Sequence, residues 1–169
     1  MPTLATLNTL DRAAFTTALG HLFEHSPWIE EETWPRRPFR DAAHLHAELC
    51  ATMRAAAPLR QLELVRAHPD LAGRLARQNA LTPDSAREQA GAGLDRLTDA
   101  ELAEFQRLNT AYLARFGFPF IICARLNAKS AILAAMQTRL TNSPEAEFVT
   151  ALGEIEKIAL LRLNDLLAS

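Results

Sequence analysis

A histidine stands at the end of a predicted helix in the stretch "LVRAHPDLAG", residues 64–73. Pro69 disfavours helical backbone angles for the residue before it, so His68 should end the helix with little backbone freedom. Histidine changes its charge near neutral pH, which a residue that transfers protons requires. A histidine at a helix end also acts simply as a cation beside the last carbonyl groups. His68 is therefore a candidate for either role.

Three polar side chains share one face of a predicted helix over residues 83–91. Ser85, Glu88 and Gln89 are spaced i, i+3 and i+4, which places them on the same side. Such a face is either solvated surface or the wall of a site. Gly91 and Gly93 follow it and allow another backbone to approach closely, which suits a site wall as well as a loop.

One arginine interrupts an apolar stripe in the predicted last helix. The stripe at three- and four-residue spacing consists of Phe148, Leu152, Ile155, Ala159 and Leu166. Arg162 occupies the slot that follows Ala159. A buried guanidinium without a partner is costly, so this side chain must reach solvent, pair with a carboxylate or receive an anionic ligand.

The stretch "FGFPFIICAR", residues 116–125, carries no charge between Phe116 and Cys123. It is either plain core or an apolar wall with a binding role. Pro119 interrupts helix formation, so the backbone N–H and C=O groups here are not all used in a helix. Such groups in an apolar wall suit a polar heterocycle. A strand is also compatible with these residues, but no partner strand is visible.

The pattern of histidines and cysteines does not favour a metal site. His21 and His25 share a helix face but lack the glutamate of an HExxH motif, while His44 and His46 point to different faces. The two cysteines form no CxxC pair. No glycine-rich phosphate loop and no GxSxG motif occurs. We therefore expect no bound metal.

Helix start and stop signals cover most of the chain. In the first half they predict helices over 11–25, 41–56 and 58–68, a loop over 26–41 and a short helix over 70–79. In the second half Thr82 precedes a proline at the first helical position, and Thr98 with Glu101 forms a capping box for a helix that Gly117 closes. The last two helices are predicted near 128–141 and 144–167.

Composition and pattern together predict one all-α domain over 1–169, a bundle of about seven to nine helices. The net charge of −2 excludes a strong pull toward nucleic acid or an anionic membrane. No stretch approaches the roughly 20 apolar residues of a membrane helix, and no signal peptide is recognised. With two cysteines that form no framework, we expect a cytoplasmic protein.

Four blocks in order along the chain resemble one family. They are "AHPDLAG", "LTPDSAREQAGAGLDRLT", "FGFPFIICAR" and "EIEKIALLRLNDLL", and the earlier stretch "SPWIEEETWPRRPF" adds to the likeness. The family is that of the 2-oxo-4-hydroxy-4-carboxy-5-ureidoimidazoline (OHCU) decarboxylases, which are carboxy-lyases of urate degradation. The resemblance implies an all-helical homodimer without metal or organic cofactor, which converts OHCU to (S)-allantoin and CO2 in purine catabolism.

The resemblance also assigns site residues by position. It implies that His68 is the catalytic histidine and Glu88 its acidic partner. It implies substrate contacts from Pro69, from the segment Ser85, Ala86, Arg87, Glu88 and Gln89, from the segment Phe120, Ile121, Ile122, Cys123 and Ala124, and from Arg162. Ala86 and Arg87 need contribute only their backbone.

Two alternatives belong to other classes. The tripeptide His-Pro-Asp is also the signature of J-domain co-chaperones, where it follows a strongly basic helix. Here the preceding helix "PLRQLELVRA" holds two arginines and one glutamate, and the other blocks have no J-domain counterpart. The second alternative is a non-catalytic binding protein of the same fold for a ureide or small anion.

Overall fold

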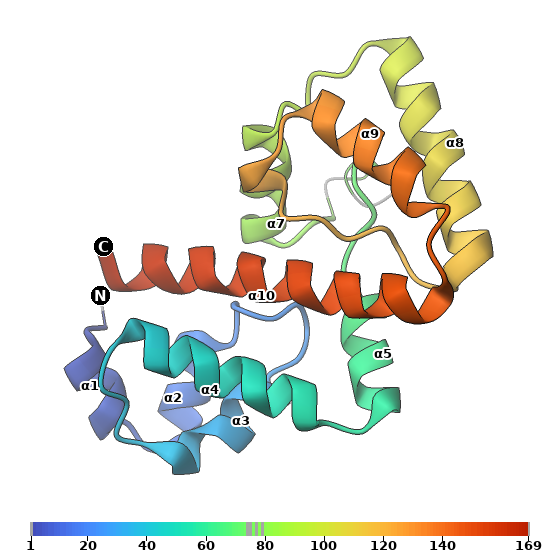
Figure 1. Cartoon of the computed structure of the whole chain (residues 1–169). Coiled ribbons are helices and arrows are strands. Elements are labelled where there is room, and N and C mark those ends of the chain that lie inside the picture. Colours follow the sequence, from blue (N-terminus) through green and yellow to red (C-terminus); the bar gives the residue numbers. More distant parts are fainter. Residues whose placement is uncertain (1, 74–75, 77, 79, 169) are drawn as a thin grey trace. The chain divides into compact units, whose positions relative to one another are not determined.

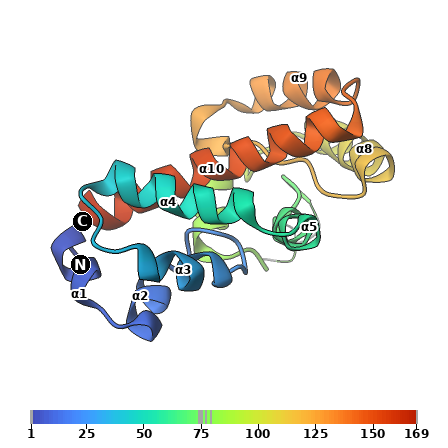
Figure 2. The same cartoon turned by 60° about the horizontal axis from the view of Figure 1, so that its bottom comes forward.

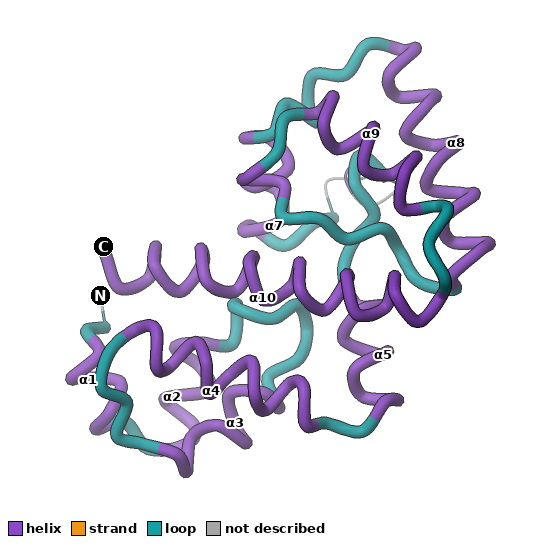
Figure 3. Tube along the Cα trace, viewed as in Figure 1, coloured by secondary structure: helices purple, strands orange, loops and turns teal. Residues whose placement is uncertain are grey.

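The computed structural model describes residues 2–73, 76, 78 and 80–168. Within these residues every regular element is a helix, as Figure 3 shows, so the all-α prediction is confirmed. The chain's contacts gather into two compact units: unit 1 is Met1–Ala67 with Glu156–Ser169, and unit 2 is His68–Ile155. No helix of the described residues is long and apolar enough to span a membrane. The single domain over 1–169 stays a prediction.

Unit 1 is built from short helices packed around an apolar core. Its described elements are α1 (Leu4–Thr9), α2 (Arg12–Leu19), α3 (Trp28–Thr33), the 3₁₀ helix η1 (Trp34–Arg36), α4 (Ala42–Ala55), α5 (Pro58–Ala67) and the last part of α10 (Pro144–Ala168). Helix α3 packs against both α2 and α4 (Figures 1 and 2). The starts of α4 and α5 at residues 42 and 58 agree with the predicted ones.

The N-terminal third differs from the prediction in two places. The helix expected over 11–25 ends at Leu19, and Gly20 follows it. The expected loop over 26–41 contains α3 and η1. Pro27 precedes α3, and the first turn of α3 holds Glu31, whose negative charge favours a helix N-terminus. Helix α1 was not predicted, since six residues are too few to show a period.

Side-chain hydrogen bonds hold the segment after α3 in place. Asn8 donates to the Phe39 carbonyl at 2.9 Å and accepts from the Phe39 amide at 2.8 Å. Arg37 donates to the carbonyls of Asn8 and Leu10, and the Trp34 indole also donates to Leu10. These contacts satisfy backbone groups that no helix uses.

Unit 2 carries most of the predicted site residues. Its described elements are α7 (Pro83–Gly91), α8 (Asp99–Phe116), the 3₁₀ helix η2 (Ala124–Leu126), α9 (Lys129–Arg139) and the first part of α10. The capping box of Thr98 and Glu101 and the left-handed Gly117 (φ 74°) confirm the predicted limits of α8. Of the short helix expected over 70–79, residues 71–73 form a turn and a bend instead and Ala76 is helical, while residues 74, 75, 77 and 79 lie outside the described residues.

Glu30 is a carboxylic acid inside the core of unit 1. Its residue is 0% exposed, and neither carboxyl oxygen has a hydrogen-bond partner among the described residues. Burial, with a smaller contribution from the negative charge of Glu31, raises the pKa of Glu30 from 4.5 to about 8. The folded protein therefore keeps this carboxyl protonated at pH values where the unfolded chain ionises it.

The first prediction is that Glu30 makes the fold less stable as pH rises. Because the folded-state pKa is the higher one, its contribution is lost between pH 4.5 and about 8, at about 1.4 kcal/mol for each pH unit. Glu30→Gln should flatten this decline in urea unfolding measured from pH 5 to pH 8. Glu32→Gln, which changes an exposed glutamate of the same helix, is the control. Equal slopes for wild type and Glu30→Gln would contradict the burial argument.

Candidate functional site

His68 lies where the sequence places it, directly after the last residue of α5. The residue is 7% exposed, so the imidazole is enclosed by protein. The turn that follows is held from α8, because the Asn109 amide donates to the Leu71 carbonyl at 2.8 Å. Pro69 and this hydrogen bond restrict the backbone on the C-terminal side of the histidine.

Helix α7 directs two of its three predicted polar side chains into the protein. Ser85 and Gln89 are each 5% exposed, so a fully solvated face is wrong for them. Glu88 is half-buried, whereas Arg87 is largely exposed and pairs with Asp84. The helix starts as predicted, with the Thr82 hydroxyl accepting from the Ser85 amide.

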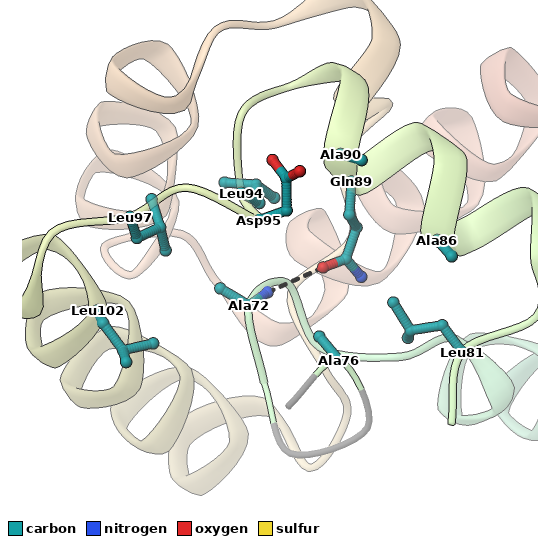
Figure 4. Close-up of a pocket in the computed structure, with 10 residues that line it drawn as sticks. All are labelled: Ala72, Ala76, Leu81, Ala86, Gln89, Ala90, Leu94, Asp95, Leu97 and Leu102. Atoms are coloured by element: carbon teal, nitrogen blue, oxygen red, sulfur yellow. Dashed lines mark hydrogen bonds between the residues drawn. The ribbon is translucent and has the colours of Figure 1, made fainter. Parts of the chain in front are cut away.

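A hydrogen bond joins the turn after His68 to α7. The Ala72 amide donates to Oε1 of Gln89 at 3.0 Å (Figure 4), and Ala72 has a left-handed backbone (φ 50°). The amide nitrogen of Gln89 has no hydrogen-bond partner among the described residues. The segment that carries His68 and the helix that carries Glu88 are thus tied together within unit 2.

A pocket of about 450 Å³ opens beside this hydrogen bond (Figure 4). Its mostly apolar lining consists of Ala72, Ala76, Leu81, Ala86, Gln89, Ala90, Leu94, Asp95, Leu97 and Leu102. Of the predicted site residues, the lining includes Ala86 and Gln89, but not His68 or Glu88. The pocket therefore lies on a neighbouring face of α7.

The segment between α8 and η2, which we call the extended segment, is buried and ends in extended backbone at Cys123. Phe120, Ile121, Ile122, Cys123 and Ala124 are all at most 8% exposed. The segment runs close to α7, since α7 packs against η2. Two charged side chains hold its backbone: Arg139 donates to the Ile121 carbonyl and Glu154 accepts from the Cys123 amide, each at 2.8 Å.

The Cys123 thiol lies close to two carboxylates. Burial raises the pKa of this thiol, and the negative charges of Glu154 and Glu88 raise it further. Glu88 is therefore near the extended segment as well as on the helix tied to His68. A thiol with a raised pKa stays protonated and is a poor nucleophile, so Cys123 fills space here.

Arg139 is itself fixed by a buried ion pair that the sequence analysis missed. Glu147 is 0% exposed and accepts hydrogen bonds from Arg139, from the Tyr112 hydroxyl and from the Asn142 amide. Burial and the bond to Glu147 raise the pKa of Tyr112. Glu147 lies eight residues before Ile155, on the same face of α10 as the apolar stripe. A glutamate on that face is the sequence feature that would have predicted a buried carboxylate here.

Arg162 belongs to unit 1, where it pairs with a carboxylate. Its guanidinium donates to Glu24 at 3.1 Å and to the His21 carbonyl at 3.0 Å, and both charged side chains are 3% exposed. Of the three possibilities for this arginine, pairing with a carboxylate is thus observed. Its predicted contact with the substrate stays a prediction.

No group of three metal-ligating side chains occurs in the part of the chain that the structure describes. His21 and His25 are exposed, and His46 hydrogen-bonds the Glu156 carbonyl at 2.8 Å.

Comparison with known proteins shows the family to which this chain is similar. The family model described as OHCU decarboxylase matches residues 8–164. A protein of Halalkalicoccus jeotgali named 2-oxo-4-hydroxy-4-carboxy-5-ureidoimidazoline decarboxylase is 42% identical, covering 97% of this chain and 91% of its own. A Mus musculus protein of the same name is 40% identical, and the match covers 96% of this chain and 92% of the mouse protein.

Two solved structures have a similar fold. The first is a crystal structure of (S)-allantoin synthase, whose sequence is 32% identical to this one and whose fold matches with a TM-score of 0.76. The match covers 98% of this chain and 54% of the synthase chain. This chain thus spans about half the length of that protein. A crystal structure of OHCU decarboxylase in the presence of (S)-allantoin is 22% identical with a TM-score of 0.71, covering 95% and 100%, and supports the fold alone.

The second prediction tests the hydrogen bond that joins the His68 turn to α7. Gln89→Leu leaves the buried Ala72 amide without its acceptor, so the free energy of unfolding should fall by about 1–3 kcal/mol. Chemical denaturation measures this change. Arg87→Leu places the same side chain at an exposed position of α7 and should change stability little. Equal stabilities for the two variants would show that this contact does not hold the turn.

Proposed function

The chain belongs to the OHCU decarboxylase family, and from this premise we propose that it decarboxylates OHCU to (S)-allantoin and CO2. The observation that carries the proposal is the match to proteins of that name over nearly the whole of both chains. The geometry supports it, because the His68 turn, the helix of Glu88 and the extended segment are joined within unit 2.

The substrate itself provides the electron sink for this reaction. Loss of CO2 from C4 leaves an electron pair, which the adjacent C5=N bond accepts, and an enol-like C4=C5 bond forms. The reaction therefore needs no organic cofactor to stabilise a carbanion. The protein must move a proton from the C4 hydroxyl and deliver one to C5 on a single face.

His68 is the proposed proton donor, with Glu88 as its acidic partner. A carboxylate near the imidazole favours the protonated ring and fixes its orientation. The enclosed position and the restricted backbone before Pro69 suit delivery to one face, because the donor has little freedom to move. Because this fixed acid protonates C5 from one face only, the product has a single configuration.

The remaining predicted residues bind the substrate in this proposal. Pro69, the segment Ser85–Gln89 and the segment Phe120–Ala124 form its walls, and Arg162 contacts an oxygen. A tight grip on the departing carboxylate would stabilise the ground state and slow the reaction. We therefore assign Arg162 to the ureido or ring oxygens, or to orienting the carboxylate without neutralising it in the transition state.

The proposal extends to assembly and compartment. The resemblance to the family supports a homodimer, which size-exclusion chromatography with light scattering would measure. The two cysteines form no framework, which supports a reducing compartment such as the cytoplasm.

The deciding experiment generates OHCU freshly from urate and follows (S)-allantoin by circular dichroism, with and without the protein. The uncatalysed reaction gives racemic product, so a signal of one hand reports catalysis. Saturable binding of allantoin without such a signal would favour the alternative, a ureide-binding protein of this fold. Stimulation of an Hsp70 ATPase would favour the co-chaperone alternative, and we expect none.

The third prediction concerns His68. His68→Ala should lower the turnover number by roughly 10²–10⁴, the usual effect of losing a positioned acid or base. The far-ultraviolet circular dichroism spectrum should remain that of a helical protein. His21→Ala, which removes an exposed imidazole, serves as the control. If His68→Ala still formed (S)-allantoin at the wild-type rate, His68 would have no role in the mechanism.

The fourth prediction concerns Arg162. Arg162→Ala should raise the Michaelis constant for OHCU more than it lowers turnover, because the proposed contact is to an anionic substrate. The change also leaves Glu24 buried without this partner, so thermal unfolding is measured on the same sample. Arg162→Lys keeps the positive charge and should lose less affinity. Unchanged kinetic constants in both folded variants would argue against a substrate contact.

A further inference from the structure

Ile122 lies between two peptide groups that are each bonded to a charged side chain. On one side, Nη1 of Arg139 donates to the Ile121 carbonyl oxygen at 2.8 Å. On the other, Oε2 of Glu154 accepts from the Cys123 amide at 2.8 Å. A cation and an anion therefore act on the two peptide bonds that flank one residue.

Each charge acts on a backbone group of Ile122 through the peptide bond. The Ile121 carbonyl and the Ile122 N–H belong to the same peptide group, so a guanidinium at that oxygen makes the N–H a stronger donor. The Ile122 carbonyl and the Cys123 N–H likewise share a peptide group, so the carboxylate makes this carbonyl a stronger acceptor. Hydrogen-bonded groups polarise each other in this way, and more so when one partner is charged.

The two strengthened groups of Ile122 have no hydrogen-bond partner among the described residues. Ile122 is 8% exposed, and buried backbone groups without a partner are rare and costly in proteins. In extended backbone, which Cys123 adopts, the groups of successive residues point to opposite sides, so those of alternate residues share a side. Those of Ile121 and Cys123 face the side chains of α9 and α10, so those of Ile122 face the other way.

The charged side chains are themselves held in place. Arg139 is anchored by buried Glu147 and lies over the Phe120 ring, with its guanidinium carbon 4.3 Å from the ring centroid. The Asn127 amide donates to the Cys123 carbonyl at 2.9 Å, which holds the next peptide group along the chain. The donor and acceptor of Ile122 thus have a set spacing and direction before any ligand arrives, which lowers the entropy cost of binding.

We propose that Arg139 and Glu154 are positioning residues that prepare the N–H and C=O of Ile122 to bind the amide edge of a cyclic ureide. Such an edge carries an N–H beside a C=O and matches an adjacent donor and acceptor. The inference rests on the proposed function, because OHCU and allantoin both carry edges of this kind. Neither charged side chain touches the substrate in this arrangement.

The fifth prediction uses Glu154→Gln, which keeps an acceptor oxygen for the Cys123 amide but removes the negative charge. The dissociation constant of (S)-allantoin, measured by calorimetry, should rise roughly five- to tenfold, as for a weakened hydrogen bond. The Michaelis constant for OHCU should rise similarly with little change in turnover, because the contact is made in both ground and transition states. Glu145→Gln, on an exposed residue of α10, should change neither constant.

N-methylated allantoins test the contact without relying on a variant. Methylation of the edge N–H that faces Ile122 removes the donor, so wild-type protein should bind that derivative weakly, and Glu154→Gln should weaken it no further. Equal wild-type affinity for allantoin and every N-methylated form would overturn the inference, and so would equal effects of Glu154→Gln on all probes. Selective binding of allantoin over its N-methylated forms, without decarboxylation of OHCU, would contradict the proposed function but would still support this inference.

Discussion

The buried ion pair of Arg139 and Glu147 is the constraint on which the rest of unit 2 depends. Glu147 is 0% exposed and is bonded by groups from α8, α9 and the connection before α10. A buried charge that loses its partner is strongly destabilising, so these elements must stay together. The same guanidinium reaches the Ile121 carbonyl and thereby sets the backbone of the extended segment. A structural pair and a binding wall are thus linked by one side chain.

The parts of the proposed site are rigid for different reasons. His68 is restricted covalently by the following proline and by a turn that Asn109 and Gln89 hold from two helices. The extended segment is restricted by charged side chains at alternate residues. Chemistry without a cofactor depends on such restriction, because the protein contributes position and proton transfer and the substrate contributes the electron sink.

Local signals predicted helix limits well where a capping group acts on its own helix. Thr82, Thr98 and Gly117 mark the limits of α7 and α8 as expected, because their hydrogen bonds join residues a few positions apart. The helix expected to reach residue 25 ends at Leu19, although Leu22 and Phe23 are still buried. Apolar spacing indicates burial, and a turn can bury the same side chains as a helix. The family is confirmed, because its model matches residues 8–164, a range that includes three of the four blocks and most of the last.

The amino-acid sequence alone was enough for the helical class and the family, and it named the candidate site residues, because periodicity, capping and motif order are all local properties of a chain. Folding decided the partners: Gln89 for the Ala72 amide, Glu24 for Arg162, and Glu154 for the Cys123 amide. These partners lie 17, 138 and 31 residues apart in the chain. No spacing rule reaches so far, since such pairs form only when burial brings distant polar groups together and each must then be satisfied.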